Sequence, residues 1–213
     1  MKSFVAGLFG ILALSGVASA QPAEATGYIA GVAQSAFGNV TSQSFGVEGG
    51  WFYTPRLAVF VELGGMRDTA PSTIGPAAQS IASYLGIVQS QPVGYSVKQP
   101  AAFGAVGARY TLADRGRFHP YALLAVGAAR VTRDVAFTIG STDVTATLDN
   151  YGVTLGTDLA GSTTKPMLTL GGGVAWMPRG AWQFDAGYRF SRISTDPTGT
   201  SVSRLGVGIG YRF

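Results

Sequence analysis

The stretch Ser203–Phe213, SRLGVGIGYRF, decides the fold that this sequence predicts. Apolar residues alternate along it with glycine and arginine. The apolar set is Leu205, Val207, Ile209, Tyr211 and Phe213, and the set between them is Arg204, Gly206, Gly208, Gly210 and Arg212. Successive side chains of a β-strand point to opposite faces, so a period of two predicts a strand. One face of this strand is apolar and the other is small and charged.

The same alternation predicts eight strands along the chain. They are Gly27–Phe37, Ser44–Tyr53, Leu57–Arg67, Pro100–Leu112, Phe118–Arg130, Pro166–Met177, Trp182–Arg192 and Ser201–Phe213. A tilted strand needs about 9–11 residues to cross a bilayer, whereas strands of soluble proteins average about 5–6 residues. The predicted strands have the length of membrane-spanning strands.

The connections alternate between short and long. TPR, ADRGR and PRGA are short and rich in turn-forming residues, whereas residues 68–97 and 131–165 form long loops. Short turns on one side and long loops on the other are typical of outer-membrane barrels, in which the long loops are extracellular. We therefore predict an all-β fold, an eight-stranded antiparallel up-and-down transmembrane β-barrel.

The composition indicates which strand face points into the barrel. The chain has 31 glycines and only 12% charged residues, about half the charge of a typical soluble domain. Small residues with a few charges suit a narrow lumen, so the apolar face should contact lipid. Alternation then places seven charged residues inside: Glu48, Glu62, Arg109, Arg130, Asp185, Arg189 and Arg204. We expect them to pair, as a packed polar core or as the lining of an ion-conducting path.

Aromatic residues cluster near the turn-side ends of the strands. The expected girdle consists of Trp51, Tyr53, Tyr110, Tyr121, Trp176 and Trp182. Amphipathic rings favour the interface between membrane and water, so this clustering agrees with a spanning barrel.

Three stretches carry a family resemblance: RFHPYALLAVGAA (Arg117–Ala129), DAGYRFSRI (Asp185–Ile193) and GVGIGYRF (Gly206–Phe213). With them, the chain resembles the small opacity-type and OmpA- and OmpX-like barrels, which include porin-family members. The resemblance implies an eight-stranded barrel that contacts outer-membrane lipid. It also implies that the last strand, through Tyr211 and Phe213, is recognised by the barrel assembly machinery.

The first twenty residues predict a cleaved signal peptide. Lys2, an apolar run and the Ala18-Ser19-Ala20 exit fit the secretory pattern. The mature protein should therefore comprise residues 21–213 and reside in the outer membrane of a Gram-negative bacterium. The net charge of +4 is small and dispersed, which does not favour nucleic-acid binding.

No sequence pattern predicts an enzyme, a cofactor or a metal site. The single histidine, His119, falls at the periplasmic end of a strand, away from the outer rim where barrel enzymes place theirs. The spacing of Asp143, Asp149 and Asp158 fits no calcium loop.

The long loops are the remaining candidates for function. Residues Gly75–Gly86 have helical spacing of apolar residues and predict a short helix, either a lid on the barrel or a segment that contacts the membrane or a partner. Residues 135–148 alternate on both sides of Gly140 and predict a β-hairpin with an edge for strand pairing. Two functions stay open: a non-enzymatic barrel that displays loops for adhesion, partner binding or envelope integrity, and a narrow channel for ions or small solutes.

Overall fold

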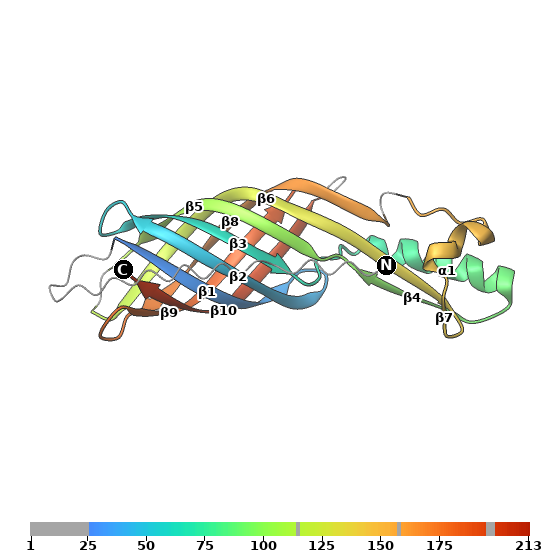
Figure 1. The fold of residues 1–213 in the computed structure, drawn as a ribbon, viewed down its shortest axis with the longest axis horizontal. Coiled ribbons are helices and arrows are strands. Elements are labelled where there is room, and N and C mark those ends of the chain that lie inside the picture. The colour runs from blue at the N-terminus through green and yellow to red at the C-terminus, as the bar shows by residue number, and fades with distance from the viewer. Residues whose placement is uncertain (1–25, 114–115, 157–158, 195–198) are drawn as a thin grey trace.

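Eight long antiparallel strands form a closed barrel, as predicted (Figure 1). The computed structural model describes residues 26–113, 116–156, 159–194 and 199–213; the predicted signal peptide lies outside them. The barrel strands are β1 Gly27–Phe37, β2 Thr41–Phe52, β3 Leu57–Met66, β5 Ala101–Thr111, β6 Phe118–Ile139, β8 Gly161–Trp176, β9 Trp182–Ile193 and β10 Thr200–Arg212.

Each barrel strand pairs with the barrel strands that precede and follow it in the chain, and β1 pairs with β10 to close the circle. The closing register sets Tyr28 opposite Arg212 and Phe37 opposite Ser203. Three turns at one end are short, and the longer connections gather at the other end, beyond which β6 projects (Figure 1). The barrel is thus an up-and-down meander with an elaborated end.

The alternation in the sequence becomes an inside and an outside. Phe60, Ala125 and Val131 are buried in the apolar part of the barrel core. On β10, Leu205, Val207 and Ile209 point outward, and more than half of each side-chain surface is exposed. A barrel that exposes bulky apolar side chains all round needs a solvent other than water.

A second set of elements lies beyond the elaborated end of the barrel (Figure 1). It consists of helix α1 Ile74–Gln89, strand β4 Val93–Lys98, strand β7 Thr142–Asp143 and the 3-10 helix η1 Thr145–Tyr151. The predicted helix at residues 75–86 is confirmed; it begins one residue earlier and ends three residues later. Neither helix in the described part of the chain is long and apolar enough to cross a membrane.

The predicted hairpin over residues 135–148 is only half right. β6 does continue out of the barrel to Ile139 and forms a short hairpin with β7, with Ile139 opposite Thr142. The longer partner of this extension is β4, with Val93 opposite Ile139. After the turn at Gly140, β7 is only two residues long and η1 follows. Val144 immediately precedes η1, and Leu148 lies within it. Both side chains are buried against the apolar residues of β6.

Candidate functional site: a charged lumen and an extracellular subdomain

Six charged side chains meet inside the barrel. This lumen cluster consists of Glu48, Glu62, Arg109, Asp185, Arg189 and Arg204. Strand register brings them together: Glu48 on β2 lies directly opposite Glu62 on β3, and Arg189 on β9 lies directly opposite Arg204 on β10. The two carboxylates and the two guanidiniums therefore come from different sides of the barrel and meet across the lumen.

Arg189 joins the two glutamates. Its Nη2 lies 2.6 Å from Glu48 Oε2, and its Nη1 lies 2.7 Å from Glu62 Oε1. Arg204 Nη1 donates to the same Glu62 oxygen at 3.0 Å. Arg109 Nη2 donates to Asp185 Oδ2 at 2.8 Å, and its Nη1 lies 3.7 Å from Glu48 Oε1. Three carboxylates and three guanidiniums thus form one continuous network with no net formal charge.

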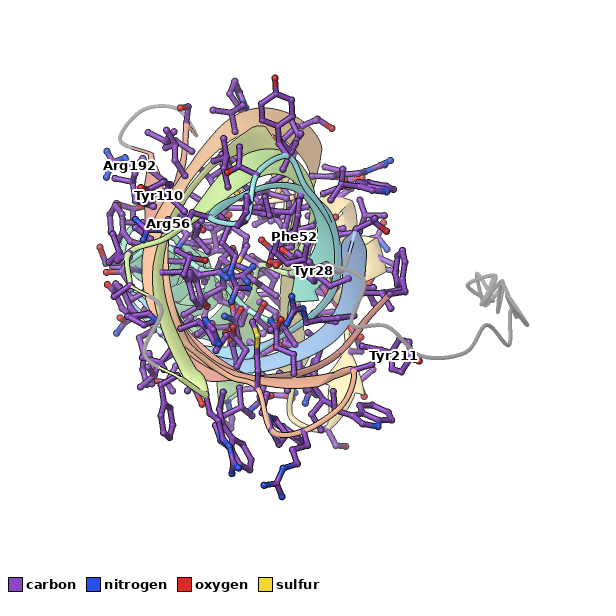
Figure 2. The ribbon with its side chains drawn as sticks, turned by 90° about the vertical axis from the view of Figure 1, so that its left-hand side faces the viewer. Tyr28, Phe52, Arg56, Tyr110, Arg192 and Tyr211 are labelled. Carbon is purple, nitrogen blue, oxygen red and sulfur yellow. The ribbon has the colours of Figure 1, made fainter. Side chains whose placement is uncertain are left out.

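Two tyrosines extend this network. Tyr28 donates its hydroxyl hydrogen to Glu48 Oε1 at 2.6 Å, and Tyr121 donates to Asp185 Oδ1 at 2.6 Å. The Arg109 guanidinium lies over the Tyr121 ring, 3.5 Å from its centroid. Viewed from the short-turn end, Tyr28 lies within the ring of strands, whereas Tyr110 and Tyr211 lie outside it (Figure 2).

Inward-facing glycines leave the space that these tyrosines occupy. A Cβ atom added at Gly173 or at Gly187 would lie 2.7 Å from the Tyr121 hydroxyl, and one at Gly50 would overlap the Tyr28 ring. Any larger residue at these positions would push the rings away from their carboxylates. The glycine-rich inner face is therefore what allows the aromatic part of the network.

The network fills the section of the lumen in which it lies. Glu48, Glu62, Arg189 and Arg204 are each at most 3% exposed. A cavity bordered by Tyr28, Arg109 and Gln183 has a volume of only about 10 Å³, roughly the space of one water molecule. Buried charges are tolerated when they are paired and hydrogen-bonded. We call this packed section of the lumen the electrostatic plug.

The structure places two sequence-assigned residues on the opposite face from the one expected. Arg130 is exposed on the outer surface and takes no part in the lumen cluster. Tyr121 is 3% exposed and belongs to the lumen, not to the outer girdle. Both lie on β6, whose inward residues are odd-numbered, as the burial of Leu123 and Ala129 shows. Because β6 is apolar on both faces, its sequence gives little indication of this parity.

A subdomain formed by the long loops is the second candidate site. It comprises α1, β4, η1 and residues 132–139 of β6. The subdomain has an apolar core of its own, separate from that of the barrel. The buried members of this core are Ile74, Ala78, Ala82, Leu85, Val135, Phe137, Val144, Leu148 and Leu159. The long loops thus fold into a packed unit that stands on the barrel end (Figure 1).

The surface of this subdomain around α1 and the groove beside it is apolar and uncharged. Ile87 is 80% exposed, and Tyr84 and Val88 on the same helix are half exposed. Beside them, a groove of about 530 Å³ lies between α1 and β4, with Ile87 and Tyr95 among its lining residues. No residue from 69 to 97 carries a charge.

The single histidine of the sequence lies beside the lumen. His119 is half-buried and borders the small lumen cavity near Arg109 and Met177, on the short-turn side of the barrel. Within the described ranges, no group of three or more potential metal ligands occurs.

Comparison with known proteins identifies the family. Residues 9–213 match the model of the outer membrane protein beta-barrel domain. This chain belongs to that family. Among solved structures, the N-terminal barrel of OprF from Pseudomonas aeruginosa is similar, with 13% identity over 87% of this chain and 96% of that chain and a TM-score of 0.50. No curated protein matches the sequence.

Two further outer-membrane barrels are similar in fold. Neisserial surface protein A has 15% identity over 88% of this chain and 96% of that chain, with a TM-score of 0.49. Ail of Yersinia pestis has 16% identity over 88% of this chain and 97% of that chain, with a TM-score of 0.46.

Membership of this outer-membrane family explains the apolar exterior. The exposed apolar side chains around the outside of the barrel, such as Leu205 and Val207, face lipid. Five of the six girdle aromatics are exposed on this surface: Trp51, Tyr53, Tyr110, Trp176 and Trp182. Tyr211 and Phe213 are exposed at the same end of the barrel, and the Phe213 carbonyl accepts a hydrogen bond from the Gly27 amide at 3.0 Å.

Sequence reasoning missed Tyr28 as a member of the lumen network. A signal was present, because Tyr28 has the same parity in β1 as Gln34, a polar residue that is 7% exposed inside the barrel. The small residues Gly31 and Ala33 alternate with them on the outer face.

Proposed function

We propose that this outer-membrane barrel is non-enzymatic and that it binds an extracellular partner through the subdomain formed by its long loops. The barrel then serves as a membrane anchor and a rigid base. The observation that carries the proposal is the separate apolar core of the subdomain. A barrel can close with unstructured loops. A packed unit of loops is therefore not needed for the barrel itself, and we infer that it serves binding.

The chemistry of the subdomain surface favours an uncharged, partly apolar partner. Ile87, Tyr84 and Val88 form an exposed patch at a helix end directed away from the barrel. Central apolar and aromatic residues with a neutral polar surround are typical of protein–protein contact surfaces. One structure of Ail is a complex with the heparin analogue sucrose octasulfate, but residues 69–97 of this chain offer no Lys or Arg to a sulfate.

The ion pairs of the lumen make the second function, a narrow channel, less favourable. An ion in transit would have to displace Arg189 from two carboxylates that it contacts at 2.6 and 2.7 Å. Separating buried ion pairs costs several kcal/mol, so steady conduction through this section is unfavourable.

Two proposals concern how the protein reaches its site. We propose that residues 1–20 are removed during export, and that Tyr211 and Phe213 on the last strand engage the assembly machinery. The outward direction of both rings leaves them available to another protein before the barrel closes. Removing Phe213 should lower the amount of folded protein in the outer membrane.

An attachment assay tests the proposed function. Gram-negative cells that display the wild-type protein, Ile87→Asp or Ile87→Leu at equal surface levels are offered epithelial monolayers, immobilised serum proteins and a lawn of the same cells. We expect the wild type and Ile87→Leu to attach to at least one surface, because both keep an apolar side chain at the tip. Ile87→Asp should attach no better than cells without the protein. Equal attachment by Ile87→Asp, or no attachment by the wild type, would contradict the proposal.

A further inference from the structure

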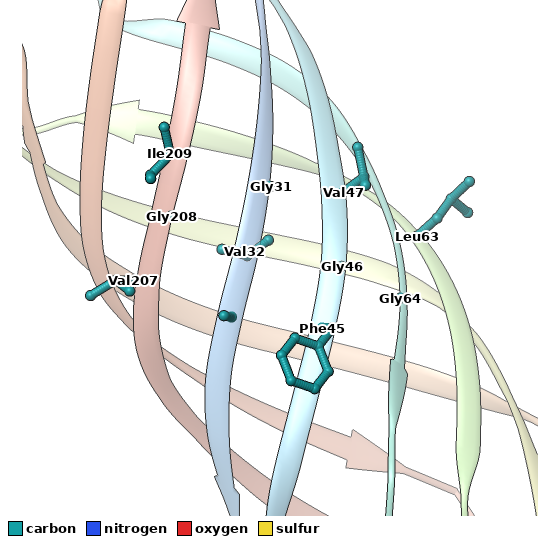
Figure 3. A pocket seen from close by; sticks show the side chains of 11 residues that line it. Gly31, Val32, Phe45, Gly46, Val47, Leu63, Gly64, Val207, Gly208 and Ile209 are labelled. Atoms are coloured by element: carbon teal, nitrogen blue, oxygen red, sulfur yellow. The ribbon is translucent and has the colours of Figure 1, made fainter. Parts of the chain in front are cut away.

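An apolar groove runs along β1 on the lipid-facing side of the barrel. It has a volume of about 630 Å³. Its floor is formed by the outward positions Gly31 and Ala33, and its walls by the bulky residues of the two neighbouring strands (Figure 3). The described surface is therefore hollowed at a place where other strands present bulky side chains to lipid.

Strand register creates this groove. Gly31 lies opposite Val47 on β2 and opposite Ile209 on β10. Ala33 lies opposite Phe45 on β2 and Val207 on β10 in the same way. Each small residue is thus flanked on both sides by a large one. A Cβ atom added at Gly31 would meet no atom within 4 Å, so the space above the floor is open.

The extracellular end of the groove is polar on the side of β2 and β3. The next outward residue on β1 is Ser35, which lies opposite Gln43 on β2 and Leu205 on β10. Gln43 Oε1 accepts a hydrogen bond from Arg67 Nη1 at 3.1 Å, and Arg67 is exposed. A groove lined by hydrocarbon therefore leads to a cation held at the level where the strands leave the membrane.

We propose that this groove is a specific site for one acyl chain of lipid A, with a phosphate of the same lipid bound at Arg67. The groove is continuous with the lipid-facing belt, so its natural occupant is a lipid. Its polar end is extracellular, which selects the outer leaflet, where the lipid is a phosphorylated glycolipid. Arginine is well suited to phosphate because it can donate two parallel hydrogen bonds. The proposal rests on the outer-membrane location alone and is independent of what the subdomain binds.

Native mass spectrometry of the refolded barrel in a nonionic detergent tests the site, with diphosphoryl lipid A as the probe. The wild type should retain one lipid A molecule at concentrations at which further adducts are rare. Gly31→Leu fills the floor of the groove, and its Cβ atom would meet no atom within 4 Å. It should weaken retention about tenfold, the effect of losing the burial of roughly two methylene groups.

Two matched variants separate the parts of the site. Ala186→Leu places the same leucine side chain at a small outward residue of β9, opposite Val207 but outside the groove, and should retain lipid A like the wild type. Arg67→Gln should weaken retention of lipid A several-fold but leave retention of a dephosphorylated lipid A unchanged. Folding of each variant is checked by its mobility shift on unheated gels.

The outcomes that would overturn the proposal are distinct. Equal retention by Gly31→Leu and the wild type would show that the groove holds no acyl chain. If Arg67→Gln retains phosphorylated and dephosphorylated lipid A in the same ratio as the wild type, Arg67 does not bind the phosphate. A dimer mass that disappears in Gly31→Leu would assign the groove to a second copy of this chain instead.

Discussion

Replacing Glu62 with glutamine tests the electrostatic account of the lumen. Glu62 Oε1 contacts Arg189 at 2.7 Å and Arg204 at 3.0 Å, and its side chain is 1% exposed. Glu62→Gln keeps the shape but gives the lumen cluster a formal charge of +1. Arg204 then loses its carboxylate, and its remaining neighbours are Ser191 Oγ at 3.2 Å and the Phe103 ring.

The expected loss is about 3–5 kcal/mol, the usual effect of leaving one member of a buried ion pair without its partner. The free energy of unfolding would be measured by urea titration of the protein refolded in lipid vesicles, from tryptophan fluorescence. A matched control is Asp149→Asn, the same chemical change at an exposed carboxylate of the subdomain, which should alter the free energy by less than about 0.5 kcal/mol.

A double variant separates charge from shape. Glu62→Gln with Arg204→Met restores neutrality and leaves two carboxylates with two guanidiniums in the cluster. It should recover much of the stability that Glu62→Gln loses, because no unpaired charge remains. If Glu62→Gln unfolds within about 0.5 kcal/mol of the wild type, or if the double variant is no more stable than the single one, the account of a tightly coupled network is wrong.

Three further changes probe other parts of the molecule. Val207→Arg places a charge on the lipid face and should destabilise the inserted barrel by about 2–4 kcal/mol in the same vesicle assay; an unchanged midpoint would contradict the orientation. Tyr121→Phe removes the hydroxyl bonded to Asp185 at 2.6 Å and should cost about 1.5–3 kcal/mol, whereas Tyr110→Phe on the outer face should cost little. Leu85→Ala opens a hole in the subdomain core and should weaken that unit by about 2–5 kcal/mol, seen as faster proteolysis of residues 69–98 in a barrel that still resists heat on gels. Equal proteolysis of Leu85→Ala and the wild type would show that the unit is not held by this core.

The barrel strands could be predicted closely because each of them has one lipid-facing side. In β10, Leu205, Val207 and Ile209 alternate with glycines. This contrast allows only one orientation of the strand, with the three bulky side chains pointing to lipid. The same contrast correctly indicated the inward direction of Arg189 and Asp185 on β9. In β6, Leu123 and Leu124 are both apolar, and the parity that buries Tyr121 and exposes Arg130 is decided by register with neighbouring strands.

The subdomain of the long loops could be predicted only in part because its order comes from contacts between distant segments. The helical spacing of Ala78 and Leu85 is local, so α1 was visible in the sequence. β4 is six residues long and gains its partner from β6, about forty residues further along the chain, with Lys98 opposite Asp134. Likewise, the alternation of Val144, Ala146 and Leu148 predicts a strand, whereas η1 forms there and Val144 and Leu148 are buried in a core built with distant segments.

Conductance in planar bilayers tests the central claim most directly, namely that the lumen is closed and that the subdomain is not the lid of a channel. The purified wild-type barrel and a variant in which residues 69–98 are replaced by a short turn would be measured side by side. The electrostatic plug predicts no steady single-channel current from either protein, because the lumen cluster is present in both. A steady current from the wild type, or one that appears when residues 69–98 are removed, would contradict the account and make the protein a channel with the subdomain as its lid.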